Sequence, residues 1–201
     1  MVIVLLLVFL LPLQKAAIAV APGPPPQKKE TYVAPFTPMP EPPKVPKVDM
    51  GSCPFEGCQF GEWTAVKPVV IYSTWRAGRK QIAGLRAGEK VTALTGVNVV
   101  LQAGKGTFTR DVPMFGAKRG DALYMYQDCG EGAADIWVHG RFIRCADPDF
   151  SWKPGLGCQT NCNGRFLELG KSEWWVKIRF KSGAIGWVLV NNNFEGQDAL
   201  G

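Results

Sequence analysis

The clearest alternation of apolar and polar positions lies near the C-terminus, where two apolar runs between Trp174 and Leu189 flank Ser182-Gly183. A two-residue loop with glycine is typical of a tight β-hairpin, because its turn requires positive φ. This loop would place Phe180 opposite Ile185 and give the hairpin one apolar face with period two. We expect that face to be buried; it would carry Val176, Ile178, Phe180, Ile185, Trp187 and Leu189.

The other face of this predicted hairpin would be aromatic and basic. It would carry Trp175, Lys177, Arg179 and Lys181, with Gly186 and Val188 opposite. A small residue beside the strip would leave it open to a ligand, although solvated strand charges are the simpler interpretation. On the same register, Trp187 is expected to pack in the core, because a Trp buries a large area.

From Cys53 onward, short runs of Val, Ile, Tyr and Trp are separated by glycines, and no long helical periodicity occurs. This pattern predicts an all-β fold. Two of the expected strands would form a second hairpin around Gly130-Glu131-Gly132, and a long connection would follow it. The expected strands are 66–72, 82–85, 90–101, 108–112, 120–126 and 135–143, with the connection over 146–172.

The N-terminal third has a different composition. Residues 2–13 are almost all apolar and small residues follow near Ala21, so residues 1–21 are predicted to be a cleaved signal peptide. An uncleaved membrane anchor is the alternative. Residues 22–52 are rich in proline and are expected to be a disordered spacer. The folded domain is then predicted over 53–201, with a division into 53–145 and 146–201 as the alternative.

The six cysteines favour disulfide bonds, because an exported chain enters an oxidising compartment. Two pairs enclose short loops and a third lies at the two ends of the second predicted hairpin. The expected bonds are Cys53–Cys58, Cys129–Cys145 and Cys158–Cys162. The short spacings also resemble halves of zinc sites, but export makes a metal the weaker interpretation. We expect no metal and no other cofactor.

The formal net charge of +6 is mild and spread along the chain. Nucleic-acid binding needs a concentrated basic patch, so no nucleic-acid partner is expected. Weak attraction to an anionic envelope polymer is compatible with this charge. Contact with a membrane is expected only through the N-terminal segment, if that segment is not cleaved.

Two blocks of the sequence resemble the bacterial SH3-like domain. The first contains Val69–Tyr72 and Leu85-Arg-Ala-Gly-Glu-Lys-Val91, and the second contains Trp175–Ile178 and Gly183-Ala-Ile-Gly-Trp-Val188. The resemblance covers roughly residues 65–101 and 173–194 and implies a small barrel, here with a large insertion carrying the second hairpin. It also implies a non-catalytic extracytoplasmic module that binds peptidoglycan, its stem peptides or a protein. Fold alone does not fix the function.

Residues suited to catalysis are few. The single histidine, His139, is expected inside a strand and no nucleophile motif accompanies it. Carboxylates could still hydrolyse a glycan as a general acid and base; the candidates are Glu131, Asp135, Glu168 and Glu173. We expect no enzymatic activity, and a cell-wall hydrolase with such a carboxylate site is the alternative.

Binding is the better-supported class. Aromatic rings supply contact area at low entropic cost, and arginine donates to carboxylates. We therefore expect an exported envelope or periplasmic module that holds a cell-wall peptide or an envelope protein. A structural or inhibitory protein that plugs a groove with the loop at Trp75 is a further alternative. The predicted ligand-binding residues are Tyr72, Trp75, Arg76, Trp175 and Arg179.

Overall fold

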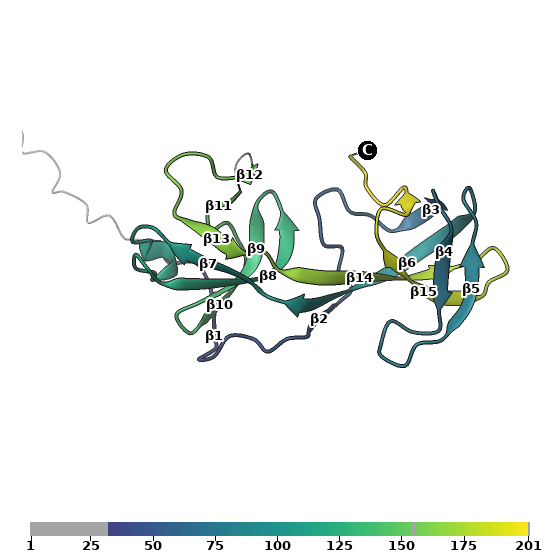
Figure 1. The fold of residues 1–201 in the computed structure, drawn as a ribbon, viewed down its shortest axis with the longest axis horizontal. Helices are drawn as coiled ribbons and strands as arrows, with labels where there is room; N and C mark the ends of the chain where they lie inside the picture. The colour runs from purple at the N-terminus through teal and green to yellow at the C-terminus, as the bar shows by residue number, and fades with distance from the viewer. Residues whose placement is uncertain (1–31, 154–155, 201) are drawn as a thin grey trace, which may run out of the picture. The chain divides into compact units, whose positions relative to one another are not determined.

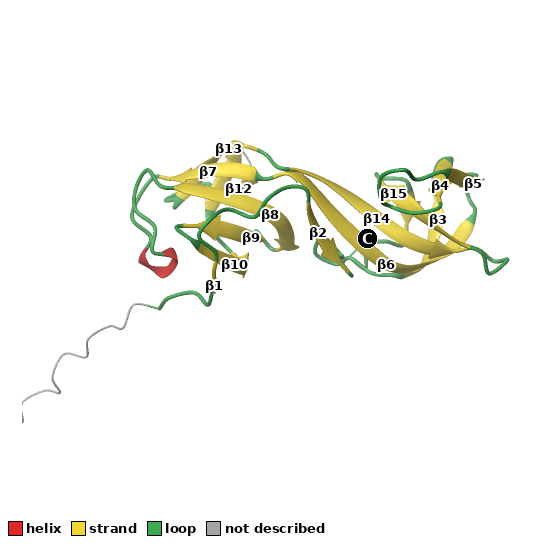
Figure 2. Ribbon diagram, turned by 90° about the horizontal axis from the view of Figure 1, so that it is seen from below, coloured by secondary structure: helices red, strands yellow, loops and turns green. Residues whose placement is uncertain are grey.

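The computed structural model describes residues 32–153 and 156–200. The predicted signal peptide and the first part of the proline-rich segment lie outside the described residues. Within the described part the chain folds into two eight-stranded sheets, here called sheet A and sheet B (Figure 1). The all-β prediction is therefore confirmed, and the helical element of the described residues is a short 3-10 turn, Pro113–Phe115, drawn in red in Figure 2.

Sheet A is built mainly from the middle of the chain. Its strands pair antiparallel except for β11 and β13, which are parallel. In spatial order they are β1 (Thr37–Pro38), β10 (Arg141–Ala146), β9 (Ala133–Val138), β8 (Ala122–Gly130), β7 (Gly104–Phe108), β13 (Gly164–Glu168), β11 (Phe150–Lys153) and β12 (Leu156–Gly157).

Sheet B contains both blocks of sequence described above. In spatial order its strands are β16 (Phe194–Glu195), β3 (Gly61–Ala65), β6 (Lys90–Gln102), β14 (Lys171–Arg179), β15 (Ile185–Val190), β4 (Val69–Tyr72) and β5 (Gln81–Leu85), with β2 (Lys47–Met50) also paired to β6.

Strand β6 organises sheet B because it uses both of its edges. One edge pairs with β14 from Thr92 to Gln102. The other edge pairs with β3 over residues 90–93 and with β2 over residues 97–100. Beyond Gln102 the chain continues directly into β7 of sheet A, so one extended stretch supplies strands to both sheets (Figure 1).

The prediction that the proline-rich segment is an unpaired spacer as far as residue 52 is wrong for its second half. Residues 37–38 pair with β10, and residues 47–50 pair with β6. Each pairing occupies the free edge of a longer strand, where a proline nearby removes few ladder hydrogen bonds. The proline-rich composition indicates that the segment cannot form a core of its own. It gives no information about the open edges of other strands with which the segment can pair.

The prediction of a single strand over 135–143 is also wrong, because that stretch is itself a hairpin. Strands β9 and β10 pair with Val138 opposite Arg141. The two residues between them, His139 and Gly140, have φ values of 48° and 71°. Positive φ at both loop positions is the pattern of a two-residue hairpin turn whose twist matches the strands. The histidine is therefore exposed on a turn.

Each sheet has its own buried cluster. The sheet A cluster includes Phe108, Leu123, Ile136 and Val138, each at most 1% exposed. The sheet B cluster centres on Trp63, which is fully buried and packs edge-to-face on Trp174. The indole N–H of Trp63 donates to the Gln59 carbonyl at 3.1 Å, so its polar atom is satisfied as burial requires. No helix among the described residues is long and apolar enough to cross a membrane.

The three predicted disulfide pairings are confirmed: Cys53–Cys58, Cys129–Cys145 and Cys158–Cys162. Beside the second bond lies Asp135, whose side chain is 1% exposed. The backbone N–H of Cys145 donates to its Oδ1 at 3.1 Å, and Arg144 Nε lies 3.6 Å from the same oxygen. The Cys129–Cys145 bond therefore fixes the chain beside a buried carboxylate that has cationic neighbours.

Candidate aromatic and basic binding surface

The C-terminal hairpin forms as expected, but its register differs by one residue. Arg179 pairs with Ile185, and the Phe180 N–H donates to the Ala184 carbonyl, so the loop has three residues, Lys181 to Gly183. Gly183 has a φ of 86°, as the last position of a three-residue hairpin loop requires. A shift of one residue changes which residues of β15 share a face with those of β14.

The corrected register moves Trp187 out of the core. It now lies opposite Lys177 and shares a face of sheet B with Trp175 and Leu189, while Gly186 faces the buried side. A Cβ on Gly186 would lie 2.3 Å from Ile71 Cγ2, so glycine at this position allows β4 to approach β15. The prediction that Trp187 packs in the core and that Gly186 borders the ligand strip is therefore wrong.

The consequence is an aromatic cluster on the outer face of sheet B, contributed by the loop 73–80 and by strands β4, β6, β14 and β15. Trp175 and Val97 are at most 1% exposed and form its floor. Half-buried side chains surround them. The cluster comprises Tyr72, Trp75, Val97, Val99, Trp175, Trp187 and Leu189, and we call it the aromatic face.

Two arginines of the loop 73–80 cover these rings. The guanidinium carbon of Arg76 lies 5.3 Å from the centre of the Trp75 ring. Arg79 lies 4.5 Å from the ring centre of Trp175 and 5.6 Å from that of Tyr72. An arginine over an aromatic ring is attracted by the negative potential of the ring face. Both arginines remain exposed, so their N–H groups are available to a ligand.

Two neighbouring side chains fix Trp175 in place. Its ring meets Tyr72 edge-to-face at 5.6 Å, and its indole N–H donates to Glu173 Oε2 at 2.8 Å. Its hydrogen-bonding group is thus already used and its face lies under Arg79. Trp175 supports the aromatic face and is not itself accessible to a ligand, in contrast to the sequence prediction.

Of the five predicted ligand-binding residues, the structure brings Tyr72, Trp75, Arg76 and Trp175 together. Arg179 is exposed on the same face of β14 but four residues further along, about 13 Å from Trp175 at the rise of a strand. It lines a small cavity of about 80 Å³ with Lys90 and Lys181. Sequence reasoning did not assign Arg79 to the site and favoured the core for Trp187, because the positions of both residues depend on loop folding and on hairpin register.

Comparison with models of known protein families, with curated proteins and with solved structures finds no match to this chain. The proposed function therefore rests on the geometry of the aromatic face.

An apolar row extends from the aromatic face towards β2. Val99 lies opposite Val48 and Val97 lies opposite Met50, so these four side chains share one face. Val48 is 40% exposed and Met50 is 66% exposed. The aromatic face thus continues into an open aliphatic surface, which lengthens the contact area available to an extended ligand.

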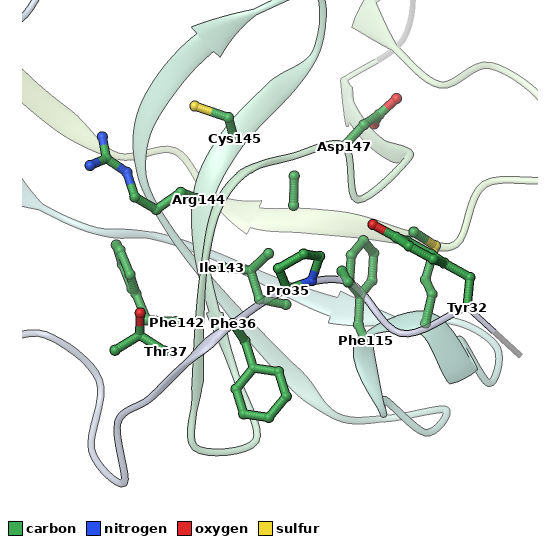
Figure 3. A pocket seen from close by; sticks show the side chains of 13 residues that line it. Tyr32, Pro35, Phe36, Thr37, Phe115, Phe142, Ile143, Arg144, Cys145 and Asp147 are labelled. Carbon is green, nitrogen blue, oxygen red and sulfur yellow. The ribbon is translucent and has the colours of Figure 1, made fainter.

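A separate cavity of about 490 Å³ lies against sheet A (Figure 3). The segment 32–37 forms one wall, and β10 with the residues after it forms another. Its lining is mostly apolar and aromatic, including Tyr32, Phe36 and Phe142. Arg144 and Asp147 are the two charged side chains among its described lining residues, and Figure 3 shows them at opposite sides of the view.

The candidate catalytic residues are dispersed. Exposed His139 has its Nε2 atom 2.5 Å from Asp121 Oδ2, and the pKa of Asp121 is held below its usual range first by the Lys118 backbone N–H and then by this histidine. Glu168 pairs with Lys105, and Glu173 holds the Trp175 indole. The two cysteine sulfurs near Asp135 belong to a disulfide bond and so cannot serve as thiolate ligands for a metal.

Proposed function

We propose that the protein is an exported, non-catalytic binding module that holds peptidoglycan stem peptide on the aromatic face. The observation that carries the proposal is the position of the Arg76 and Arg79 guanidinium groups over the rings of Trp75 and Trp175. A guanidinium held over an aromatic ring has lost part of its side-chain freedom, and its planar fork of N–H groups can donate two parallel hydrogen bonds to a carboxylate. Stem peptides carry such carboxylates along a short extended backbone.

The shape of the surface fits an extended peptide better than a compact ligand. The aromatic face continues through Val97 and Val99 to Val48 and Met50, across neighbouring strands. Half-buried Trp75 and Trp187 provide rigid contact area, which costs little side-chain entropy on binding. A peptide could therefore place a carboxylate at the arginines and aliphatic groups along the apolar row.

Two further features support export and this class of function. Three disulfide bonds are compatible with an oxidising compartment outside the cytoplasm. The two blocks that resemble the bacterial SH3-like domain supply β4, β5, β6, β14 and β15, and the aromatic face lies on these strands and on the loop 73–80. The resemblance implies a small barrel that binds cell-wall peptide without cleaving it.

The proposal is tested by retention on insoluble peptidoglycan. The wild-type chain should bind, and the variant carrying both Arg76→Ala and Arg79→Ala should bind at least about fivefold more weakly, since each lost contact of a binding hot spot costs 1 kcal/mol or more. Trp75→Ala should weaken retention similarly. The matched control is the pair Lys67→Ala and Lys118→Ala, which removes the same charge from exposed positions elsewhere.

Soluble products are measured in the same experiment. Chromatography of the supernatant should detect no released sugar or peptide. Released fragments would contradict the non-catalytic part of the proposal. Equal retention of the arginine variant and the lysine control would show that binding depends on net charge alone and would contradict a site on the aromatic face.

A further inference from the structure

The proline-rich residues 39–46, Met-Pro-Glu-Pro-Pro-Lys-Val-Pro, lie along a second aromatic surface, on sheet A. We call this segment the strap. The surface is formed by Tyr124 and Tyr126 of β8, Trp137 of β9 and Phe142 of β10. Tyr126 and Phe142 are buried, and their rings lie edge-to-face at 6.0 Å. Tyr124 and Trp137 form a second edge-to-face pair at 5.7 Å.

Two side chains of this surface donate hydrogen bonds to strap carbonyls. The indole N–H of Trp137 donates to the Met39 carbonyl at 2.7 Å, and the Tyr126 hydroxyl donates to the Pro43 carbonyl at 2.9 Å. Burial raises the pKa of Tyr126 to about 12, so its hydroxyl keeps its proton for this bond. Both donors bind backbone carbonyl oxygens, which any proline-rich segment presents.

The strap has the chemistry of a preformed ligand. Prolines fix φ, and the residues before prolines avoid the helical region, so the strap has few conformations available to it and bends at 40–41 and 45–46. No residue of the strap has positive φ. A segment ordered in this way loses little entropy when it docks, which is why aromatic grooves with N–H and O–H donors recognise proline-rich peptides.

The surface is larger than the strap that lies on it. A cavity of about 410 Å³ remains beside Pro42, Pro43 and Val45, bounded by Tyr124 and Tyr126. Lys105 and Glu168, which also line this cavity, lie 3.8 Å apart and are about half exposed. The cavity leaves room beside the strap next to Tyr124 and Tyr126, and we call the aromatic surface together with this cavity the groove.

From these contacts we infer that the groove formed by Tyr124, Tyr126, Trp137 and Phe142 is a binding site for proline-rich peptide, and that the strap occupies it in cis. The strap lies between β1 and β2, and those strands pair with β10 and β6 through their own backbones. The strap can therefore leave the groove while both of its ends stay paired. A proline-rich peptide presented in trans then takes its place.

Because the strap occupies the groove, a separate proline-rich peptide is expected to bind the wild-type chain weakly. A tethered ligand competes at an effective concentration in the millimolar range, and the apparent affinity falls by the fraction of groove that is open. Replacing Pro42 and Pro43 with glycine should loosen the strap without changing the groove, because glycine has more conformational freedom to lose on docking.

The test titrates the capped peptide Met-Pro-Glu-Pro-Pro-Lys-Val-Pro into the isotope-labelled full chain and follows the Trp137 Nε1–H resonance by NMR. Trp137→Phe assigns that resonance. We expect a saturable shift in the variant with glycine at 42 and 43, at an apparent Kd at least about fivefold below that of wild type. A peptide with glycine in place of Pro42 and Pro43 is the matched control and should bind more weakly.

Adding Tyr126→Phe to the strap variant should weaken peptide binding by about fivefold, the effect of one lost hydrogen bond. The inference is overturned if the strap variant, folded by circular dichroism, shows no peptide-dependent shift up to about 10 mM, several times the expected effective concentration. If that variant does not fold, the wild-type titration over the same range decides, and absence of any shift there overturns it as well.

Discussion

The guanidinium carbon of Arg79 lies 4.5 Å from the ring centre of Trp175, and that tryptophan is 1% exposed. The arginine thus replaces the indole at the surface of sheet B. A ligand that approaches this position meets a cation, while the ring beneath supplies only its electrostatic attraction. The site is therefore more basic and less aromatic at this point than the sequence suggested.

Arg79→Ala should reduce retention on peptidoglycan much more than it reduces stability. An exposed cation–π contact contributes about 0.5–1 kcal/mol, so the free energy of unfolding should fall by no more than about 1 kcal/mol. Urea denaturation and the retention assay measure the two effects. Arg79→Lys should restore only part of the binding, because lysine cannot stack a planar group on the ring or donate two parallel hydrogen bonds.

Gly186→Ala should destabilise the fold by about 1–3 kcal/mol, the usual cost of forcing extra atoms into a packed site. The new methyl group would lie 2.3 Å from Ile71 Cγ2 and 3.3 Å from the Tyr72 carbonyl oxygen. Thermal or urea unfolding measures the change. Gly183→Ala is the comparison: nothing lies within 4 Å of its Cβ position, so only the positive φ is penalised, by about 1 kcal/mol.

The Cys129–Cys145 bond should contribute more stability than the Cys158–Cys162 bond. Their sequence separations are 16 and 4 residues, and loop-closure entropy then gives about 3 and about 2 kcal/mol. Removing the first bond also frees the chain beside buried Asp135. Unfolding of the two double-alanine variants tests the order. Equal losses would contradict the entropic account.

Stability should fall in acid partly through Asp121. Its pKa in the folded chain is lowered, first by the Lys118 backbone N–H and then by His139. A carboxyl with a depressed folded pKa contributes stability above its unfolded pKa of about 3.9, and this contribution is lost as the pH falls through the folded pKa. Asp121→Asn should flatten the dependence of the unfolding midpoint on pH below about pH 4. An unchanged slope would exclude this carboxyl as a source.

Residue patterns local in the sequence were sufficient to predict the fold class and the disulfide bonds. Strand β6 was predicted over 90–101 and is observed over 90–102, because its runs of Val and Thr leave few alternatives. The cysteine pairs were found because each encloses a short loop or closes a hairpin. These features depend on neighbours close in sequence.

Features that depend on one residue of register or on distant strands were not predictable. A loop of three residues and one of two residues both fit Lys181-Ser182-Gly183, yet they place Trp187 on opposite faces of the sheet. Gly183 correctly indicated a turn, but it did not indicate whether the loop has two or three residues. Similarly, β3 was not predicted, because it pairs with residues 90–93 of β6, which are remote from it in sequence.

The pairing of β2 with β6 bears on where the folded domain can be cut. A chain shortened to begin at Cys53, as composition alone would recommend, loses the partner of residues 97–100. Those backbone groups would then form a bare β-edge flanked by Val97 and Val99, which is a template for intermolecular strand addition. Residues Lys47–Met50 cover this edge in the longer chain, so a chain truncated at Cys53 should precipitate under conditions in which the longer one stays monodisperse.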